Sequence, residues 1–157
     1  MGLDMHLQRE TYLSNYPKRD EETSLRQRVG ITGIDDAHII PSRIITITEE
    51  IAYWRKANAI HGWFVREIQG GVDECQRADV RLEQLKELKS LCERVLENNS
   101  LAEELLSPQS GFFFGSYDID EWYLDGLEYT RDMLNDLFNE PKPDDDYWTT
   151  YHYQSSW

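Results

Sequence analysis

The amino-acid sequence predicts an α+β fold, in which three main helices pack on a small, mostly antiparallel sheet that includes the N- and C-terminal strands. Two periodicities predict it. Apolar residues recur every three or four positions in three segments, as in amphipathic helices, and they alternate in period two near both chain ends. The 157 residues suit one domain and contain no internal repeat, so we predict a single domain over residues 1–157.

The first element, residues 3–9, is predicted to be a half-buried strand because apolar and polar side chains alternate in it. Its apolar members are Leu3, Met5 and Leu7. Residues 14–27 are polar and charged and predict an exposed loop. The β-branched residues 43–47 predict a short strand or an extended lead-in to the next element.

The first main helix is predicted over residues 46–69. Thr46 and Glu49 have the spacing of a capping box at its start, and Gly70 and Gly71 would end it. Its apolar stripe follows the spacing 4, 3, 4, 3, 4, 3, with two polar residues in the middle. The stripe consists of Ile47, Ile51, Trp54, Asn58, His61, Val65 and Ile68.

Two further main helices are predicted at residues 80–98 and 119–139. The buried face predicted for the first consists of Leu82, Leu85, Leu88, Cys92, Val95 and Leu96. The corresponding face of the second consists of Tyr123, Leu127, Thr130, Leu134 and Leu137.

A short helix through Leu106 is predicted between them, with Ser100 and Glu103 as its capping box. Asp118 or Asp120 is expected to cap the helix that follows.

The segment QSGFFFGSYDIDEWY, residues 109–123, places three phenylalanines between two glycines. We predict a short central strand, with Phe112 and Phe114 on one face and Phe113 on the other. An exposed Phe113 would instead form a patch for a partner. The acids that follow disfavour a phosphate site at the next helix N-terminus.

Residues 147–157 alternate rings and threonines in period two, which predicts a C-terminal strand. The N-terminal strand or the phenylalanine segment could pair with it.

The formal charge of −14, from 30 acidic and 16 basic residues, disfavours direct binding to nucleic acid or to an anionic membrane surface. The acidity has three interpretations: solubility, docking to a basic protein, or imitation of DNA. DNA imitation requires a dense one-sided array of carboxylates. The acids are instead spread along the chain, with one short run at Asp144, Asp145 and Asp146.

Cys75 and Cys92 form no CxxC motif and are predicted to be ordinary thiols in a reducing compartment. The N-terminal residues lack the pattern of a signal peptide, and no apolar run is long enough to span a bilayer. We therefore expect a cytoplasmic protein with no membrane partner. Asp4, His6 and His152 could meet if the terminal strands pair, but nothing in the sequence requires it, so we predict no metal site and no cofactor.

No strong catalytic motif is present, so we predict no catalytic residue. The best candidate for a ligand site is the face of the first helix that carries Asn58 and His61, flanked by Arg55, because an amide, an imidazole and a guanidinium can together hold a carboxylate, a phosphate or a base edge. Three more residues could close a pocket over this face: Gln109, Ser110 and Tyr123. The alternative is that Asn58 and His61 are core residues with hydrogen-bond partners in the sheet, and for the trio both interpretations stay open.

Four blocks carry a resemblance to a known family: MGLDM at the start, AYWRKANAIHGWFV at 52–65, QSGFFFGS…DEWY at 109–123 and the YQSSW ending. Together they resemble a family of small proteins from tailed bacteriophages and prophages, over nearly the whole chain. The sequence departs from the family mainly at 14–40 and 76–82. The resemblance implies no catalytic role.

The resemblance does imply a phage accessory protein in the host-cell cytoplasm that acts on host machinery or host defence. One mechanism is to bind and block a host protein with a basic surface, which the charge and the many aromatic residues suit. The residues predicted to contact such a partner are Phe113, Trp122, Asp144, Asp145 and Asp146. The other mechanism is a small-molecule site, for a nucleotide or a hydrolysed ligand, built on Arg55, Asn58 and His61.

Overall fold

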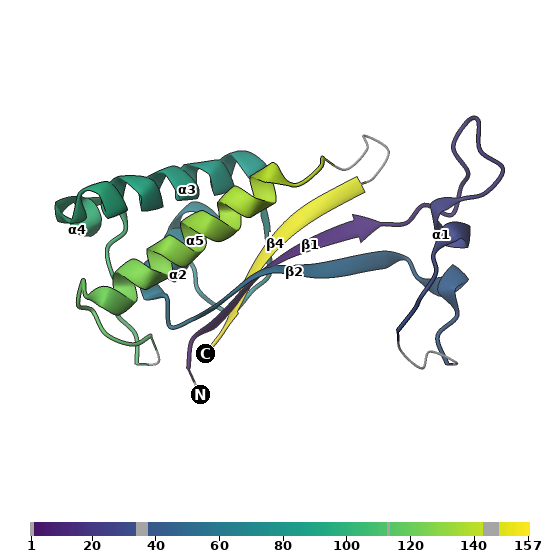
Figure 1. Ribbon diagram of the computed structural model, residues 1–157. Helices are drawn as coiled ribbons and strands as arrows, with labels where there is room; N and C mark the ends of the chain where they lie inside the picture. The colour runs from purple at the N-terminus through teal and green to yellow at the C-terminus, as the bar shows by residue number, and fades with distance from the viewer. Residues whose placement is uncertain (1, 34–37, 113, 143–147) are drawn as a thin grey trace.

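The computed structural model describes residues 2–33, 38–112, 114–142 and 148–157, and its fold is α+β (Figure 1). The α-helices of these residues are α1 (Leu25–Arg28), α2 (Asn58–Glu67), α3 (Leu82–Glu97), α4 (Ala102–Leu105) and α5 (Glu121–Asn139). The strands are β1 (Asp4–Tyr12), β2 (Thr46–Arg55), β3 (Ala78–Val80) and β4 (Trp148–Ser156). Two short 3-10 helices are η1 (Pro41–Arg43) and η2 (Asn99–Leu101). The α+β class is confirmed, and α2, α3 and α5 are the three longest of five α-helices.

The sheet has the order β2-β1-β4-β3, and every described pair is antiparallel. The two terminal strands lie side by side, with Leu7 opposite Tyr153, as the alternation at both ends predicted. Met5 and Leu7 of β1 and Tyr153 of β4 all point to one face and are fully buried there. Helices α2, α3 and α5 cover this face (Figure 1), so the hydrophobic core lies between the helices and one side of the sheet.

The predicted helix over residues 46–69 is wrong in its first half, because residues 46–55 form strand β2. The spacing of Ile47, Ile51 and Trp54 fits a helix by coincidence, whereas the burial of Ala52 and Trp54 has the period of a strand that pairs with β1. The predicted capping box is therefore absent, since Thr46 and Glu49 both belong to β2. Helix α2 begins only at Asn58, after Lys56 turns the chain with a left-handed φ of 59°.

Helices α3 and α5 lie close to their predicted positions and pack against each other (Figure 1). Asp120 caps α5 by accepting a hydrogen bond from the amide of Tyr123, as expected. The buried faces match most of the predictions, but Leu82 is exposed, and Leu96 and Tyr123 are only partly buried. The short helix α4 is present, but Asn98, not Ser100, supplies the side-chain cap of the turn before it.

The predicted phenylalanine strand is wrong for the described residues. Residues 109–112 and 114–118 form no strand, Phe112 is 96% exposed, and Phe114 is partly buried against the core. Phe112 and Phe114 therefore do not share one buried face. Phe113 lies outside the described residues.

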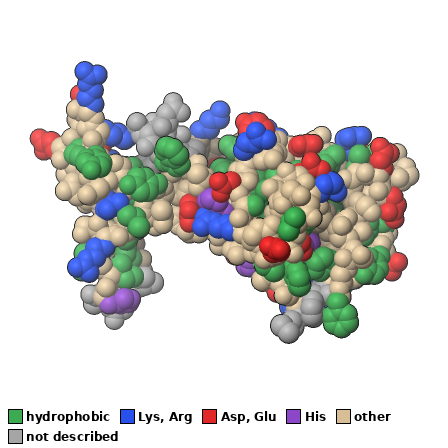
Figure 2. All heavy atoms as spheres, turned by 180° about the vertical axis from the view of Figure 1, so that it is seen from behind, with side chains coloured by type: hydrophobic (Ala, Val, Ile, Leu, Met, Phe, Trp, Pro, Cys, Tyr) green, Lys and Arg blue, Asp and Glu red, His purple; other side chains and the backbone are tan. Residues whose placement is uncertain are grey.

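Residues 13–33 and 38–45 form an arm between β1 and β2 that projects away from the helices (Figure 1). The loop predicted at 14–27 ends in helix α1, which Ser24 starts through a capping box with Gln27. Exposed hydrophobic side chains such as Tyr16 and Ile45 lie on the arm, and Figure 2 shows such groups on this part of the molecule.

Candidate functional site

Asn58 is the first residue of α2 and is almost fully buried. Its side-chain amide donates hydrogen bonds to the backbone oxygens of Phe114, at 3.1 Å, and Ser116, at 2.7 Å. The backbone of this loop would otherwise lack these donors, so Asn58 anchors the loop before α5 to the start of α2. Both of its amide hydrogens are used within the protein.

His61 lies one turn further along α2 and is only 1% exposed. Its Nδ1 atom is 2.7 Å from the hydroxyl of Tyr153, and its Nε2 atom is 2.8 Å from Oδ2 of Asp73. In the neutral imidazole, Nε2–H donates to the carboxylate and Nδ1 accepts from the tyrosine, so both ring nitrogens have partners. Burial, together with the charge of Asp73, raises the pKa of Tyr153 well above its usual value.

The last residue of the chain belongs to the same network. The indole of Trp157 donates to Oδ2 of Asp73 at 3.0 Å, and its ring lies against Phe114. Phe114 in turn makes an edge contact with the imidazole of His61. Sequence reasoning missed Asp73 and Trp157, because their contact with His61 depends on the pairing of distant segments.

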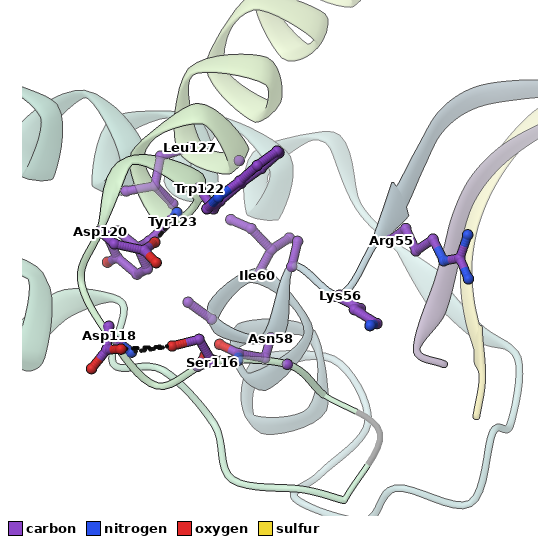
Figure 3. A pocket seen from close by; sticks show the side chains of 14 residues that line it. Arg55, Lys56, Asn58, Ile60, Ser116, Asp118, Asp120, Trp122, Tyr123 and Leu127 are labelled. Carbon is purple, nitrogen blue, oxygen red and sulfur yellow. Dashed lines mark hydrogen bonds between the residues drawn. The ribbon is translucent and has the colours of Figure 1, made fainter. Parts of the chain in front are cut away.

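Arg55 is not on α2, as the predicted helix required, but ends strand β2. Its side chain is 64% exposed and lies 4.0 Å from the carboxylate of Asp4. Figure 3 shows the guanidinium directed towards the strands and away from Asn58. The predicted trio therefore does not converge on one ligand.

The three residues predicted to close a pocket over Asn58 and His61 do not line one cavity together. The side chain of Gln109 packs so closely against Gly62 of α2 that a Cβ atom added to this glycine would lie 2.0 Å from Cγ of Gln109. Ser110 is exposed. Tyr123 donates its hydroxyl hydrogen to the backbone oxygen of Leu106 at 2.8 Å, and burial raises the pKa of this phenol. Each of these contacts supports the fold.

A cavity of about 520 Å³ lies between the start of α2 and the start of α5 (Figure 3). Arg55, Asn58 and Tyr123 line it, whereas His61, Gln109 and Ser110 do not. Its charged lining is balanced, with two cations and two carboxylates: Arg55, Lys56, Asp118 and Asp120.

The exposed face of α5 is acidic along its whole length. Its carboxylates follow the spacing 4, 3, 4, 4, which places them on one side of the helix, opposite the buried stripe. They are Glu121, Asp125, Glu128, Asp132 and Asp136, all exposed. We call these five residues the acidic face. The single basic residue of α5, Arg131, forms an ion pair with Asp132 at 2.7 Å.

Trp122 lies beside the acidic face and is 83% exposed, and its contact with a partner stays a prediction. The other predicted contacts, Phe113 and Asp144 to Asp146, lie outside the described residues. Sequence reasoning overlooked the acidic face, although its spacing is local and readable, because the acids were considered as scattered along the chain.

Within the described residues, no group of three His, Cys, Asp or Glu side chains is placed to hold a metal ion. His6 pairs instead with Glu50, and His152 with Asp79. None of the described helices is long and apolar enough to cross a membrane. Comparisons with protein-family models, with curated proteins and with solved structures give no match.

Proposed function

We propose that this chain is a non-enzymatic binding protein whose acidic face docks onto a basic surface of another protein. The observation that carries the proposal is the array of five exposed carboxylates on α5, whose only basic neighbour in the helix is already paired. The resemblance to phage proteins suggests that the partner is a host protein, which the chain would sequester or inhibit.

The geometry of the acidic face suits such a partner. From Glu121 to Asp136 the helix rises about 22 Å at 1.5 Å per residue, so the carboxylates extend over about four helical turns. Aligned charges of one sign accelerate association with a surface of the opposite sign. Trp122 adds an exposed aromatic ring at one end, the type of residue that anchors interfaces.

Imitation of DNA is less well supported by the same helix. A DNA duplex of about 22 Å carries about 13 phosphate charges, at one per 1.7 Å of axis. The acidic face carries five. Its charge density is therefore less than half that of the nucleic acid it would have to imitate.

A small-molecule site is the second candidate, favoured by the cavity of about 520 Å³ beside Arg55 and Lys56. This volume is in the range of ligand pockets. However, the amide hydrogens of Asn58 and both ring nitrogens of His61 are occupied within the protein. Only Arg55 and Lys56 remain to recognise an anion, and two carboxylates in the lining oppose it.

Affinity capture from a bacterial host extract tests the proposal with charge-matched variants. The first combines Glu121→Gln, Asp125→Asn and Glu128→Gln on α5. The second combines Glu83→Gln, Glu87→Gln and Glu97→Gln on α3. Each changes the formal charge from −14 to −11, because three of the 30 acidic residues become neutral.

We expect the wild type and the α3 variant to capture the same basic protein in a salt-sensitive manner, and the α5 variant to lose it. Equal recovery by both variants would contradict a role for the acidic face. Recovery of a nucleotide without a stoichiometric protein partner would favour the small-molecule site. Release of the captured protein by duplex DNA would show that the acidic face occupies a nucleic-acid-binding surface.

A further inference from the structure

Strand β2 is an end strand, and its backbone hydrogen bonds show which of its groups face outwards. The oxygen of Ile45 accepts from the amide of Leu13, and the amide of Lys56 donates to Leu3, so these residues face β1. The amide of Tyr53 points the other way, to the hydroxyl of Tyr129 on α5.

Along an antiparallel strand, residues whose backbone groups face the neighbouring strand alternate with residues whose backbone groups face outwards. A register shift opposite Leu7 and Gln8 interrupts this alternation once in β2. The outward-facing residues before the shift are Thr46, Thr48 and Glu50, and those after it are Tyr53 and Arg55.

The described residues cover the outer edge of β2 only in part. Tyr129 occupies the amide of Tyr53, but all five residues from Thr46 to Glu50 are exposed, and no described strand pairs with their outer side. We call Thr46–Glu50 the outer edge. An unpaired strand edge is a template for one more strand, and proteins usually guard it against chance pairing.

An acidic cavity of about 480 Å³ lies directly beside the outer edge, between β2 and the second half of α5. Among the described residues, its charged lining contains five acidic residues and one basic residue, a net charge of −4: Arg9, Glu49, Glu50, Asp132, Asp136 and Glu140. Arg9 does not neutralise the rest, because Glu49 holds its guanidinium through two bonds of 2.8 Å and Glu140 holds it through a third. The hydrogen bonds that Arg9 donates to Glu49 raise the pKa of Arg9 above its usual value.

We propose that the outer edge binds an extended basic segment of the partner as an added antiparallel strand, with its Lys or Arg side chains in the acidic cavity. This inference rests on the proposed function and names the part of the partner that is recognised. All described strand pairs of the sheet are already antiparallel. In an added strand, side chains alternate between the two faces, so every second residue reaches the cavity.

The charge of the edge selects this occupant over a second copy of the chain. Pairing two copies along the same edge would bring Glu49 and Glu50 of one against those of the other, and like charges across strands are destabilising. The formal charge of −14 on each copy adds a general repulsion. A basic segment, in contrast, would form backbone hydrogen bonds with β2 and favourable charge interactions in the acidic cavity.

The register makes a specific prediction about the backbone of the added strand. Its residues opposite Thr46, Thr48 and Glu50 hydrogen-bond to β2, and their side chains lie on the face away from the helices. The residues between them place their side chains in the cavity, and their amides point away from β2. Residues with basic side chains therefore do not donate to β2, whereas their neighbours do.

The test uses a labelled synthetic peptide of alternating Lys and Val, as long as the ten residues of β2, with fluorescence anisotropy as the readout. Two matched derivatives carry equal numbers of N-methyl groups, one on central Val residues and one on central Lys residues. Methylation of Val is expected to weaken binding about tenfold or more, because those amides donate to β2, and methylation of Lys is expected to change it much less.

Variants of the protein complete the test. Thr48→Pro removes an outward amide and no bond to β1, a position where strands tolerate proline, and circular dichroism checks its fold. Because the proline disrupts pairing at the outer edge, we expect the Val-methylated and the Lys-methylated peptides to bind this variant with equal affinity. The pair Asp132→Asn and Asp136→Asn leaves the backbone intact and is expected to weaken the unmethylated peptide several-fold, whereas Glu83→Gln with Glu87→Gln on α3 is the control.

Failure of this inference can be separated from failure of the proposed function. Equal weakening by both methylations, or no binding of the unmethylated peptide at low salt, overturns strand addition at the outer edge. Neither result affects the capture experiment, because the substitutions of its two variants lie on α5 and α3 and leave β2 unchanged. Loss of capture by the α5 variant alone would still support the acidic face.

Discussion

Helices α3 and α5 lie side by side, and each buries an apolar stripe in the same core, yet their exposed faces differ. Helix α3 carries four acidic and three basic residues, a net charge of −1, and α5 carries five acidic and one basic residue, a net charge of −4. In α3, Lys89 and Glu93 form an ion pair one turn apart. A helix in this layer can therefore be solvated without an excess of negative charge, as α3 shows, so solubility alone does not explain the net charge of α5.

The acidic face of α5 reduces the stability of its own helix. Glu121 and Asp125, Glu128 and Asp132, and Asp132 and Asp136 are like-charged pairs four positions apart, each unfavourable by about 0.2–0.5 kcal/mol. Asp136 also lies near the C-terminal end of the helix, where the helix dipole disfavours a negative charge. Under the proposed function, these carboxylates serve the binding of a partner and not the stability of the helix.

The largest expected effect concerns the contrast between the acidic face and the polar residues of α2. His61→Ala should lower the free energy of unfolding by about 3 kcal/mol or more, because it leaves a cavity and removes the partner of Tyr153 and Asp73. Urea denaturation measures it. We expect the folded fraction of this variant to bind the partner with unchanged affinity. A small loss of stability together with loss of binding would instead support the predicted ligand site on α2.

Asn58→Ala should have the next largest effect, a loss of about 2 kcal/mol, because two backbone oxygens of the loop before α5 lose their donors. The same denaturation experiment tests it. Hydrogen exchange in residues 114–118 should rise while exchange in α3 stays unchanged. Uniform exchange across both regions would show that Asn58 does not act through this loop.

The charge-matched variants should also differ in stability. Glu121→Gln, Asp125→Asn and Glu128→Gln together should stabilise the protein by a few tenths of a kcal/mol, since like-charge repulsion on α5 is relieved. The variant with three changes on α3 should be neutral or slightly destabilising, because α3 has bases beside its acids. Thermal unfolding at low salt distinguishes them; a loss of stability in the α5 variant would remove the evidence that this face opposes folding.

A further expected effect is a pH dependence at Glu49, an acid that has a basic partner. The hydrogen bonds from Arg9 hold the pKa of Glu49 below its usual 4.5. Their contribution to stability is therefore present above about pH 4.5 and is lost as the pH falls through the lowered pKa. Solvent exposure limits it to about 1 kcal/mol or less. Arg9→Met should reduce the slope of stability against pH in this range, and an unchanged slope would show that the pair contributes nothing.

Much of the fold is encoded in local patterns. The alternation in β1 and β4 and the stripes of α3 and α5 predicted these elements with boundaries close to those observed. The sequence predicts a helix at β2 because Ile47, Ile51 and Trp54 have helical spacing, whereas the strand period is visible only in the burial of Ala52 and Trp54. Only pairing with β1, a non-local contact, decides between them.

The candidate site divides in the same way. The hydrogen bond of His61 to Tyr153 spans 92 positions, and no local pattern predicts such a partner. Burial of Asn58 and His61 within the protein was one of the two alternatives that the sequence left open. The acidic face, in contrast, depends only on spacing within one helix and could have been predicted.

The most direct test of the central claim is the dissociation constant of the captured partner, measured by titration calorimetry with the two charge-matched variants. We expect the dissociation constant of the α5 variant to be about tenfold higher or more, with a smaller salt dependence. The dissociation constant of the α3 variant should stay within about threefold of that of the wild type. Equal dissociation constants for the α5 and α3 variants would contradict the claim that the acidic face of α5 binds the partner.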